Sequence, residues 1–220
     1  MLAAFVLYDR FTALDITGPY EVLNSVPMIE SVFVAERTGP VRNESGTLAI
    51  TADRSFSEMP ASDIVIVPGG FGTRALLAHE PILSWLRAAH ETSRWTTSVC
   101  TGSLLLAAAG LLDGKRATSH WLALEELRRL GAEAVEERVV FDGKLVTAAG
   151  VSAGIDMALA LAARVAGDTV AQAIQLGIEY DPQPPFEAGS PHKAPAEVVE
   201  LLRARSRYEA QQAQALAAPR

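Results

Sequence analysis

The chain has 220 residues, of which 49% are hydrophobic and 20% charged, a balance typical of a globular protein with a sizeable core. Its formal net charge of −7 argues against nucleic acid as a partner, because phosphate binding needs a positive field. The richest apolar run, residues 104–112, is far shorter than the ~20 residues of a membrane span, so no membrane partner is expected.

The cysteine content bears on location. Cys100 is the only cysteine, which excludes an internal disulfide and fits a reducing compartment, so we expect a cytoplasmic protein. The N-terminal residues MLAAFVLYDRF have no basic region ahead of the apolar run, and Asp9 and Arg10 interrupt that run. They predict a strand rather than a signal peptide.

In chain order, the apolar patterns predict strands that alternate with helices. The first half predicts a strand at Leu2–Tyr8, a helix at Ile16–Ser25, strands at Ser31–Glu36 and Asp63–Val67, helices at Thr73–Ala78 and Pro81–Glu91, and a strand at Trp95–Val99. The second half predicts a strand at Arg116–Thr118, a helix at Trp121–Leu130, a hairpin of Val139–Phe141 with Leu145–Thr147 around Asp142-Gly143, and helices at Ala153–Val165 and Thr169–Gln175. This alternation predicts an α/β fold with a mostly parallel sheet covered by helices on both faces.

The C-terminal part has a different character. Residues 1–180 are predicted to form one α/β domain, and residues 181–220 to pack on it or trail from it. Asp181–Pro195 contains five prolines and predicts an extended surface segment, followed by a helix from Ala196 to about Glu209. The Ala/Gln-rich tail beyond it predicts frayed helix or disorder.

The most informative stretch runs from Trp95 to Gly114 and contains Cys100. β-forming residues precede the cysteine and a leucine-rich helical run follows it, so the pattern predicts a sharp strand-to-helix turn with the thiol at the helix start. Backbone N–H groups and the helix dipole favour a thiolate there, and we expect a lowered pKa for Cys100. Gly102 allows the bend and leaves room for a ligand. The alternative is that Cys100 is a small buried hydrophobic residue.

Other groups are predicted to meet Cys100 at the carboxyl edge of the sheet. Asp15 follows the first strand, which brings it to that edge, although a cap for the helix from Ile16 is an alternative role. The turn Pro68-Gly69-Gly70 follows another strand and presents backbone N–H groups for a developing negative charge, with the N–H of Thr101 as a second candidate donor. The Thr101 hydroxyl lies beside the thiol, with a helix-start role as its alternative.

His120 is the candidate base, because cysteine nucleophiles often pair with an imidazole. Its alternative is a satisfied histidine that caps a strand end. The four histidines show no HxxH, HxH or Cys/His spacing, which argues against a metal. The glycine-rich turns match neither a Walker loop nor GxGxxG, so no nucleotide or other cofactor is predicted.

Four segments together carry a family resemblance: LDITGPYEVL, IVIVPGGFGT, SVCTGSLLLAAAGLLDGKRATSHW and AGVSAGIDMALALA. Over residues 2–180 the chain resembles the DJ-1/PfpI superfamily. Within it the likeness is strongest to isonitrile hydratases, whose tails resemble IEYDPQPPFEAGSP. The resemblance implies a flavodoxin-like three-layer α/β sandwich, like that of class I glutamine amidotransferases, and a homodimer.

The resemblance also implies roles for site residues. Cys100 would be the nucleophile on a strained elbow, and Asp15 would take the acidic position that other members fill with glutamate. Gly70 and Thr101 would provide backbone donors, and Thr101 would also orient the acid or the water. We further expect Gly69, Ile16 and His120 to line the substrate site.

Departures from the family patterns separate the activities. PfpI-type peptidases carry histidine directly after the cysteine, where this chain has Thr101, so a peptidase is disfavoured. The same C-T-G elbow occurs in sensor domains fused to AraC-type DNA-binding modules, but the segment after residue 180 is too short for a paired helix-turn-helix module. The expected function is therefore that of a hydro-lyase, the hydration of an isonitrile to an N-substituted formamide. The alternatives are a redox-responsive or ligand-binding protein and a glyoxalase-like activity on 2-oxoaldehydes.

Overall fold

The computed structural model describes residues 1–217, which fall into two compact units, Met1–Glu179 and the residues from Tyr180 onward. The main sheet of the first unit has seven strands within the described residues, in the order β10-β11-β7-β6-β1-β2-β5. These strands are β1 (Leu2–Val6), β2 (Glu30–Ala35), β5 (Arg54–Ser55), β6 (Ile64–Val67), β7 (Trp95–Val99), β10 (Val139–Asp142) and β11 (Leu145–Ala148). All neighbours pair in parallel except β10 and β11, which form an antiparallel hairpin.

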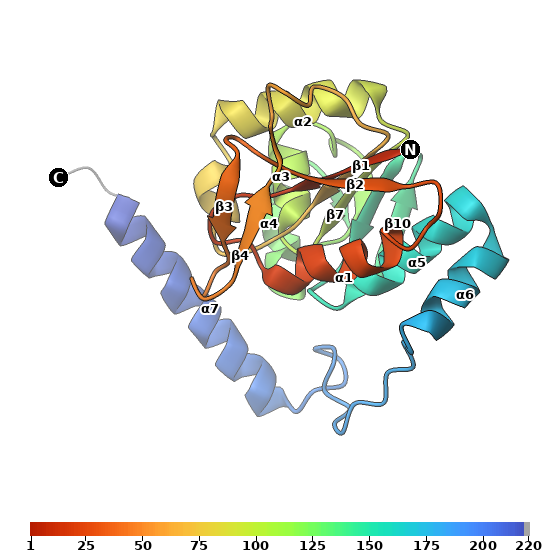
Figure 1. The fold of residues 1–220 in the computed structure, drawn as a ribbon. Coiled ribbons are helices and arrows are strands. Elements are labelled where there is room, and N and C mark those ends of the chain that lie inside the picture. The colour runs from red at the N-terminus through yellow and green to blue at the C-terminus, as the bar shows by residue number, and fades with distance from the viewer. Residues whose placement is uncertain (218–220) are drawn as a thin grey trace. The chain divides into compact units, whose positions relative to one another are not determined.

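Helices cover both faces of this sheet, so the predicted α/β class is confirmed (Figure 1). The first unit contains α1 (Ala13–Leu23), α2 (Glu80–Thr92), α3 (Gly102–Ala108), α4 (Leu124–Arg129), α5 (Ala153–Ala166) and α6 (Asp168–Gly177), with short 3₁₀ turns at η1 (Thr73–Leu76) and η2 (Trp121–Ala123). α1 and α5 pack together on one face, and α2 and α3 lie on the other (Figure 1).

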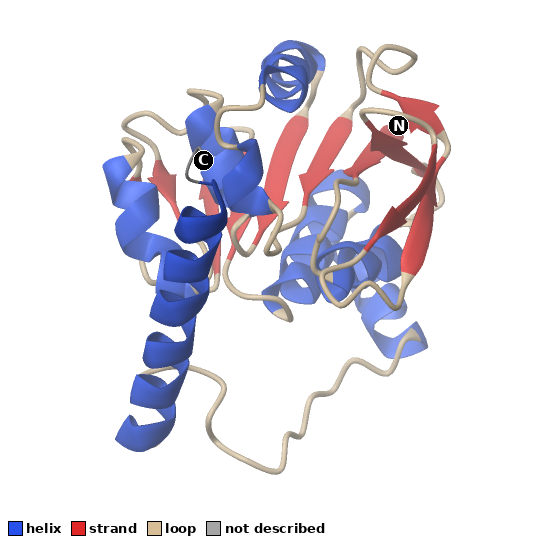
Figure 2. Ribbon diagram, turned by 90° about the vertical axis from the view of Figure 1, so that its left-hand side faces the viewer, coloured by secondary structure: helices blue, strands red, loops and turns tan. Residues whose placement is uncertain are grey.

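The central strands form because they are apolar on both faces. β6 is buried along its whole length, and residues 3–6 of β1 are fully buried beside it. A strand buried on both faces needs a helix layer on each side, and each parallel neighbour needs a crossover connection, which α1 and α2 supply. Because β1, β6 and β7 run parallel to one another, their carboxyl ends lie at the same edge of the sheet (Figure 2).

Three local features depart from the predictions. A separate two-stranded hairpin of β3 (Gly39–Arg42) and β4 (Ala49–Ala52) was not predicted, because its half-exposed residues give no clear apolar alternation. β8 (Arg116–Ala117) pairs with β9 (Glu133–Ala134) in a small sheet of its own. α3 is shorter than the predicted helical run, since the segment from Ala109 onward turns instead of continuing the helix.

The second unit contains the proline-rich segment and α7 (Ala196–Ala217). α7 continues past the predicted end at Glu209 and through most of the Ala/Gln-rich segment, because alanine and glutamine are good helix formers. Residues 218–220, the end of the predicted tail, lie outside the described residues. Within the part of the chain described here, no helix combines the length and apolar character needed to cross a membrane.

Candidate active site

Cys100 occupies a strained turn between β7 and α3. Its φ angle is 57°, in the left-handed region that non-glycine residues rarely adopt. The Cys100 N–H donates to the carbonyls of Ala148 and Ala149 at 3.0 and 3.1 Å. Its own carbonyl accepts from the hydroxyls of Ser103 and Ser119 at 3.2 and 3.0 Å. Four hydrogen bonds therefore hold the backbone in a conformation that strains an L-residue and fix the direction of the side chain.

Gly102 lets α3 approach the turn that follows β6. A Cβ atom at Gly102 would lie 2.3 Å from the carbonyl oxygen of Val67 and 2.7 Å from that of Pro68. No side chain fits at those distances, so the sequence needs glycine here for close backbone contact. The thiol and the Pro68-Gly69-Gly70 turn thereby come to the same place.

Asp15 is fully buried in the first turn of α1, although Thr12, not Asp15, is the helix N-cap. The alternative role of Asp15 as a cap is therefore wrong. The carboxylate instead accepts a hydrogen bond from the N–H of Gly69 through Oδ2, at 2.8 Å. Its other oxygen, Oδ1, is buried without a partner of hydrogen-bond geometry. A buried carboxyl oxygen left open in this way is suited to hold or receive a proton.

Burial raises the pKa of Asp15 from its ordinary value of 3.8 to about 7. The Gly69 N–H opposes this shift, the carboxylate of Glu44 adds to it, and the interaction with the Cys100 thiol opposes it. The carboxyl group therefore changes protonation near neutral pH, where a group that moves protons works best.

The pKa of Cys100 is raised, which makes the expected lowering wrong. Burial is the main cause and the nearby Asp15 carboxylate is the second. The backbone N–H groups of Thr101 and Val151 act in the opposite direction but do not prevail. α3 is a short buried helix, and its dipole does not replace the solvation that the thiolate loses. The Cys100 thiol therefore becomes a nucleophile only when a neighbouring group takes its proton, and Asp15 is placed to do so.

This arrangement predicts the reactivity of the free thiol. Iodoacetamide should label wild-type Cys100 slowly at pH 7, with a rate that rises only above the ordinary thiol pKa of about 8.5. The Asp15→Asn variant lacks the group that takes the thiol proton, so it should be labelled still more slowly than wild type at pH 7. The measurement is the labelling rate between pH 6 and 10, followed by mass spectrometry. Identical curves for the two proteins would show that Asp15 does not control the thiol.

Thr101 is the end of a chain of hydroxyl groups. Tyr8 donates to the carbonyl of Pro68 at 2.7 Å, so its single proton is committed. Thr73 must then donate to Tyr8, and Thr101 to Thr73, each across 2.9 Å. The Thr101 proton is therefore directed to Thr73 and its oxygen accepts from Gly70, while the hydroxyl group also lies near the sulfur and acts to lower the pKa of Cys100. Thr101 occupies the N-cap position of α3, so its helix-start role is confirmed, although its side chain makes no capping hydrogen bond.

The N–H groups of the Gly69-Gly70 turn are already engaged. Gly69 donates to Asp15, and Gly70 donates to the Thr101 hydroxyl oxygen at 3.0 Å. Because both N–H groups of this turn have partners in the structure, their role as donors to a developing negative charge stays a prediction. The two amides position the carboxylate and the hydroxyl group, while the N–H groups that face the sulfur come from Thr101 and Val151.

Ile16 and His120 are less closely tied to the thiol. Ile16 is fully buried among the core residues. The His120 Nδ1 accepts a hydrogen bond from the Leu122 N–H at 3.3 Å and caps η2. Its ring packs closely on Gly150, and burial, with a smaller effect of Arg74, lowers its pKa. Among the described hydrogen bonds none joins His120 to Cys100, and His120 caps the helical turn η2 rather than the strand end named as its alternative role.

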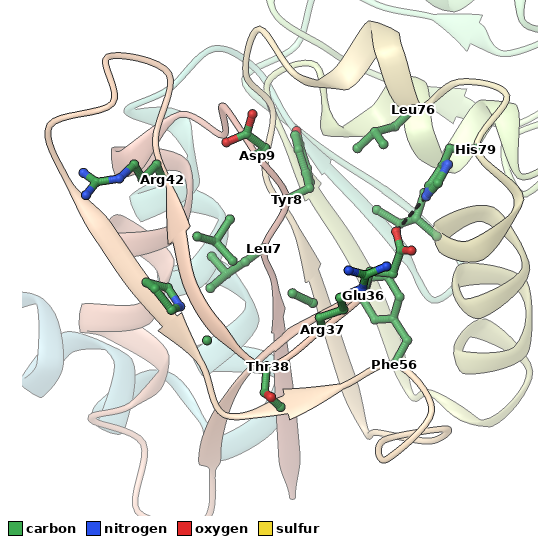
Figure 3. A pocket seen from close by; sticks show the side chains of 15 residues that line it. Leu7, Tyr8, Asp9, Glu36, Arg37, Thr38, Arg42, Phe56, Leu76 and His79 are labelled. Atoms are coloured by element: carbon green, nitrogen blue, oxygen red, sulfur yellow. Dashed lines mark hydrogen bonds and ion pairs between the residues drawn. The ribbon is translucent and has the colours of Figure 1, made fainter.

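A cavity of about 570 Å³ lies beside this site, at the carboxyl ends of β1 and β2. Figure 3 shows Tyr8 on its wall and the ion pair of Glu36 with His79, whose atoms are 2.7 Å apart. The lining of this cavity includes neither Cys100 nor Asp15. Tyr8 therefore lines the cavity and is also joined through Thr73 to Thr101 of the site.

Several site residues were not predicted from the sequence. Tyr8, Thr73 and Glu44 reach the site through hydrogen bonds that no motif reveals. Tyr8 alone could have been placed near the site from the sequence, because it ends the predicted first strand at the same sheet edge as Asp15. Within the described residues no three His, Cys, Asp or Glu side chains are grouped as metal ligands. The chemistry to be explained is that of a thiol, a carboxyl group and their backbone donors.

The family model for the DJ-1/PfpI family matches residues 1–164. The chain belongs to the DJ-1/PfpI family. It is 46% identical to an isonitrile hydratase of Pseudomonas putida over 92% of this chain and 88% of that protein. It is 35% identical to the HTH-type transcriptional regulator CdhR of Pseudomonas aeruginosa, over 60% of this chain and 40% of the regulator.

Solved structures of this family agree with the fold. A ThiJ/PfpI family protein from Pseudomonas syringae superposes with a TM-score of 0.92 at 37% identity, over 99% of this chain and 90% of that one. Drosophila melanogaster DJ-1beta superposes with a TM-score of 0.73 at 22% identity, over 81% of this chain and 97% of that one, which supports the fold alone. The DJ-1/PfpI fold thus extends well beyond the isonitrile hydratase, and the activity has to be argued from the site.

Proposed function

We propose that this protein hydrates an isonitrile, R–N≡C, to an N-substituted formamide, with Cys100 as the nucleophile and Asp15 as the group that moves the protons. The observation that carries the proposal is a buried carboxyl group that interacts with a buried thiol and has one oxygen, Oδ1, without a partner. The similarity to the isonitrile hydratase of Pseudomonas putida supports it.

The chemistry of the substrate fits this pair of groups. A thiol adds to an isonitrile at a single atom, because the sulfur and the proton both become bonded to the terminal carbon. The nucleophile and the proton donor must therefore lie side by side, as Cys100 and Asp15 do. An isonitrile is uncharged, so a site that disfavours charge does not exclude it.

The first half of the reaction forms a thioimidate. Ionised Asp15 takes the thiol proton of Cys100, and the sulfur attacks the terminal carbon. The proton held by Asp15 passes to the same carbon, which gives R–N=CH–S-Cys and restores the carboxylate. The N–H groups of Thr101 and Val151 stabilise the thiolate while it exists.

The second half consumes water. The oxygen of a water molecule bonds to the thioimidate carbon while Asp15 takes a proton from that water. Asp15 then passes this proton to the nitrogen. The carbon–sulfur bond then breaks, the hydroxyl proton returns to sulfur through Asp15, and R–NH–CHO leaves. The acceptor oxygen of Thr101 lies beside the thiol and orients the proton of the thiol or of the water.

Turnover is expected to depend on pH through Asp15. The carboxyl group must be ionised to take the thiol proton, so kcat/KM should rise as pH increases through about 7 and then level off. The rate of formamide formation from cyclohexyl isocyanide between pH 5 and 9 measures this rise in kcat/KM, which is the acid limb of the pH profile. Methylglyoxal serves as the comparison substrate. Activity on methylglyoxal alone would replace the proposal by a glyoxalase-like function.

We also propose that the protein acts as a homodimer in the cytoplasm, as the family likeness and the single cysteine suggested. Sedimentation should give about twice the chain mass of 23.4 kDa at micromolar concentration. A single species at the chain mass would contradict the dimer and leave the residues of one chain to form the site alone.

A further inference from the structure

The loop between β3 and β4 brings a second carboxylate, that of Glu44, to the Asp15 site. The N–H of Glu44 donates to the carbonyl of Phe11 at 2.9 Å, and Phe11 also bridges to Gly70 and to Asn43. The loop is therefore joined to the segment that leads into α1. The hairpin that carries it is labelled β3 and β4 in Figure 1.

Thr12 lies between the two carboxylates. Its hydroxyl donates to Oε2 of Glu44 at 2.9 Å, and its backbone N–H donates to the carbonyl of Gly69 at 2.8 Å. The N–H of the same Gly69 donates to Asp15, and the Asp15 N–H donates to the Thr12 carbonyl at 3.2 Å. Thr12 thus holds the Glu44 carboxylate through its hydroxyl group, and it is joined to Asp15 directly and through Gly69. Thr12 and Glu44 are half-buried, whereas Asp15 is fully buried.

We propose that Glu44 is a positioning residue of the proposed hydratase: fixed by Thr12, its negative charge makes the ionised Asp15 a stronger base, which takes the proton of the Cys100 thiol more readily. The inference rests on the proposed function, because it assigns Glu44 a role in the proton transfer between Asp15 and Cys100. Glu44 itself touches neither reacting group in the described contacts, and it acts through the field that its carboxylate exerts on Asp15.

The charged neighbours are consistent with this role. Cys100, from the turn after β7, and Glu44 are the ionisable groups that act on Asp15, and Asp15 and Glu44 both act on Tyr8, which follows β1. The effect of Glu44 on the Asp15 pKa is upward. Arg42, close to Glu44 in sequence, donates to the Gly46 carbonyl at 2.7 Å, and Arg10, close to Thr12 in sequence, lies over the Phe71 ring. Among the ion pairs of the described residues, none joins Glu44 to a basic side chain, so no direct partner neutralises its charge beside Asp15.

The decisive variant is Glu44→Gln, which removes the charge and keeps an oxygen that can accept from Thr12. Asp15 should then ionise at lower pH, so the acid limb of kcat/KM for cyclohexyl isocyanide should move to lower pH. At a pH below the wild-type limb the variant should be faster than wild type by about threefold, while KM stays unchanged. A merely structural role of Glu44 predicts a loss of activity at every pH.

Two further variants complete the comparison. Thr12→Val releases Glu44 from its fixed position and should move the limb in the same direction by a smaller amount. Glu21→Gln removes an exposed carboxylate from the same helix as Asp15 and should leave the limb in place.

A second readout does not need turnover. The Asp15 carboxyl carbon, labelled with ¹³C and assigned by its absence in Asp15→Asn, can be titrated by NMR in wild type and in Glu44→Gln. A titration moved to lower pH in Glu44→Gln supports the inference even if isonitriles are not hydrated, and in that case the proposed function fails alone. An Asp15 titration that is the same in both proteins overturns the role of Glu44, whatever the activity. A raised KM with an unmoved limb also overturns it, because it would place Glu44 in contact with substrate.

Discussion

Replacement of Cys100 by alanine, or of Asp15 by asparagine, is expected to remove nearly all isonitrile turnover. For Asp15→Asn the expected loss in kcat is about 10²–10⁴-fold, the usual contribution of an acid–base group to a chemical step. Cys100→Ala should lose at least as much, because the covalent route disappears. The double variant should be little worse than either single variant, since the two groups act as a unit. The measurement is the initial rate of formamide formation at pH 8.

A stability measurement separates a catalytic role of Asp15 from a structural one. The pKa of Asp15 rises from 3.8 to about 7 on folding, so the folded state holds its proton more tightly than the unfolded state. Folding stability is therefore lost as pH rises from about 4 to 7, and the full cost is present at pH 8. Asparagine avoids this cost, and its side-chain oxygen can still accept from Gly69. The inactive Asp15→Asn protein should be more stable than wild type at pH 8, by up to about 4 kcal/mol.

His120 provides the control for this experiment. Its Nδ1 is occupied by the Leu122 N–H, and Asp15 is assigned the proton transfers, so His120→Ala should lose much less activity than Asp15→Asn. Near-normal turnover in Asp15→Asn together with an inactive His120→Ala would overturn the assignment. That outcome would point to a Cys–His mechanism and away from isonitrile hydration.

The fold and the meeting of Cys100 with Asp15 could be predicted because both follow from the topology. Apolar strands such as residues 64–67 must be buried on both faces, and parallel strands bring their carboxyl ends to one edge. A residue that follows a central strand is thereby placed near the others, whatever its neighbours. Cys100, Asp15 and the Gly69-Gly70 turn each follow such a strand, so their common edge could be predicted.

The electrostatics of the site could not be predicted, because they depend on distances that no pattern specifies. The thiol was expected to be acidic from its place at a helix start, but burial and the charge of Asp15 outweigh that effect. The amides of Gly69 and Gly70 were expected to face a developing negative charge, and no pattern showed that each also has a partner inside the protein. Glu44 lies in a polar loop with turn residues, where nothing in the sequence indicates contact with Thr12.

The second large effect is expected from Gly69→Ala, which adds one methyl group between Thr101 and Asp15. A Cβ atom at Gly69 would lie 2.5 Å from the Thr101 nitrogen, 2.6 Å from the Thr101 hydroxyl oxygen and 3.0 Å from Oδ2 of Asp15. Because one of these neighbours is backbone, the turn and α3 must move apart. A displacement of about 1 Å at reacting groups can lower kcat about 10²-fold, and we expect a loss of at least this size.

The matched control is Gly18→Ala, which adds the same methyl group to the helix that carries Asp15. Its Cβ atom would lie 3.0 Å from Cγ1 of Ile155, a side chain that can shift, and it would approach no residue of the site. Both variants should lose stability, by about 1–3 kcal/mol where packing is too tight, so thermal unfolding alone does not distinguish them. The rate of formamide formation does, because Gly18→Ala should keep most of the wild-type kcat and Gly69→Ala should not. Equal losses of kcat in the two variants would show that general destabilisation, rather than the separation of Thr101 from Asp15, limits the reaction.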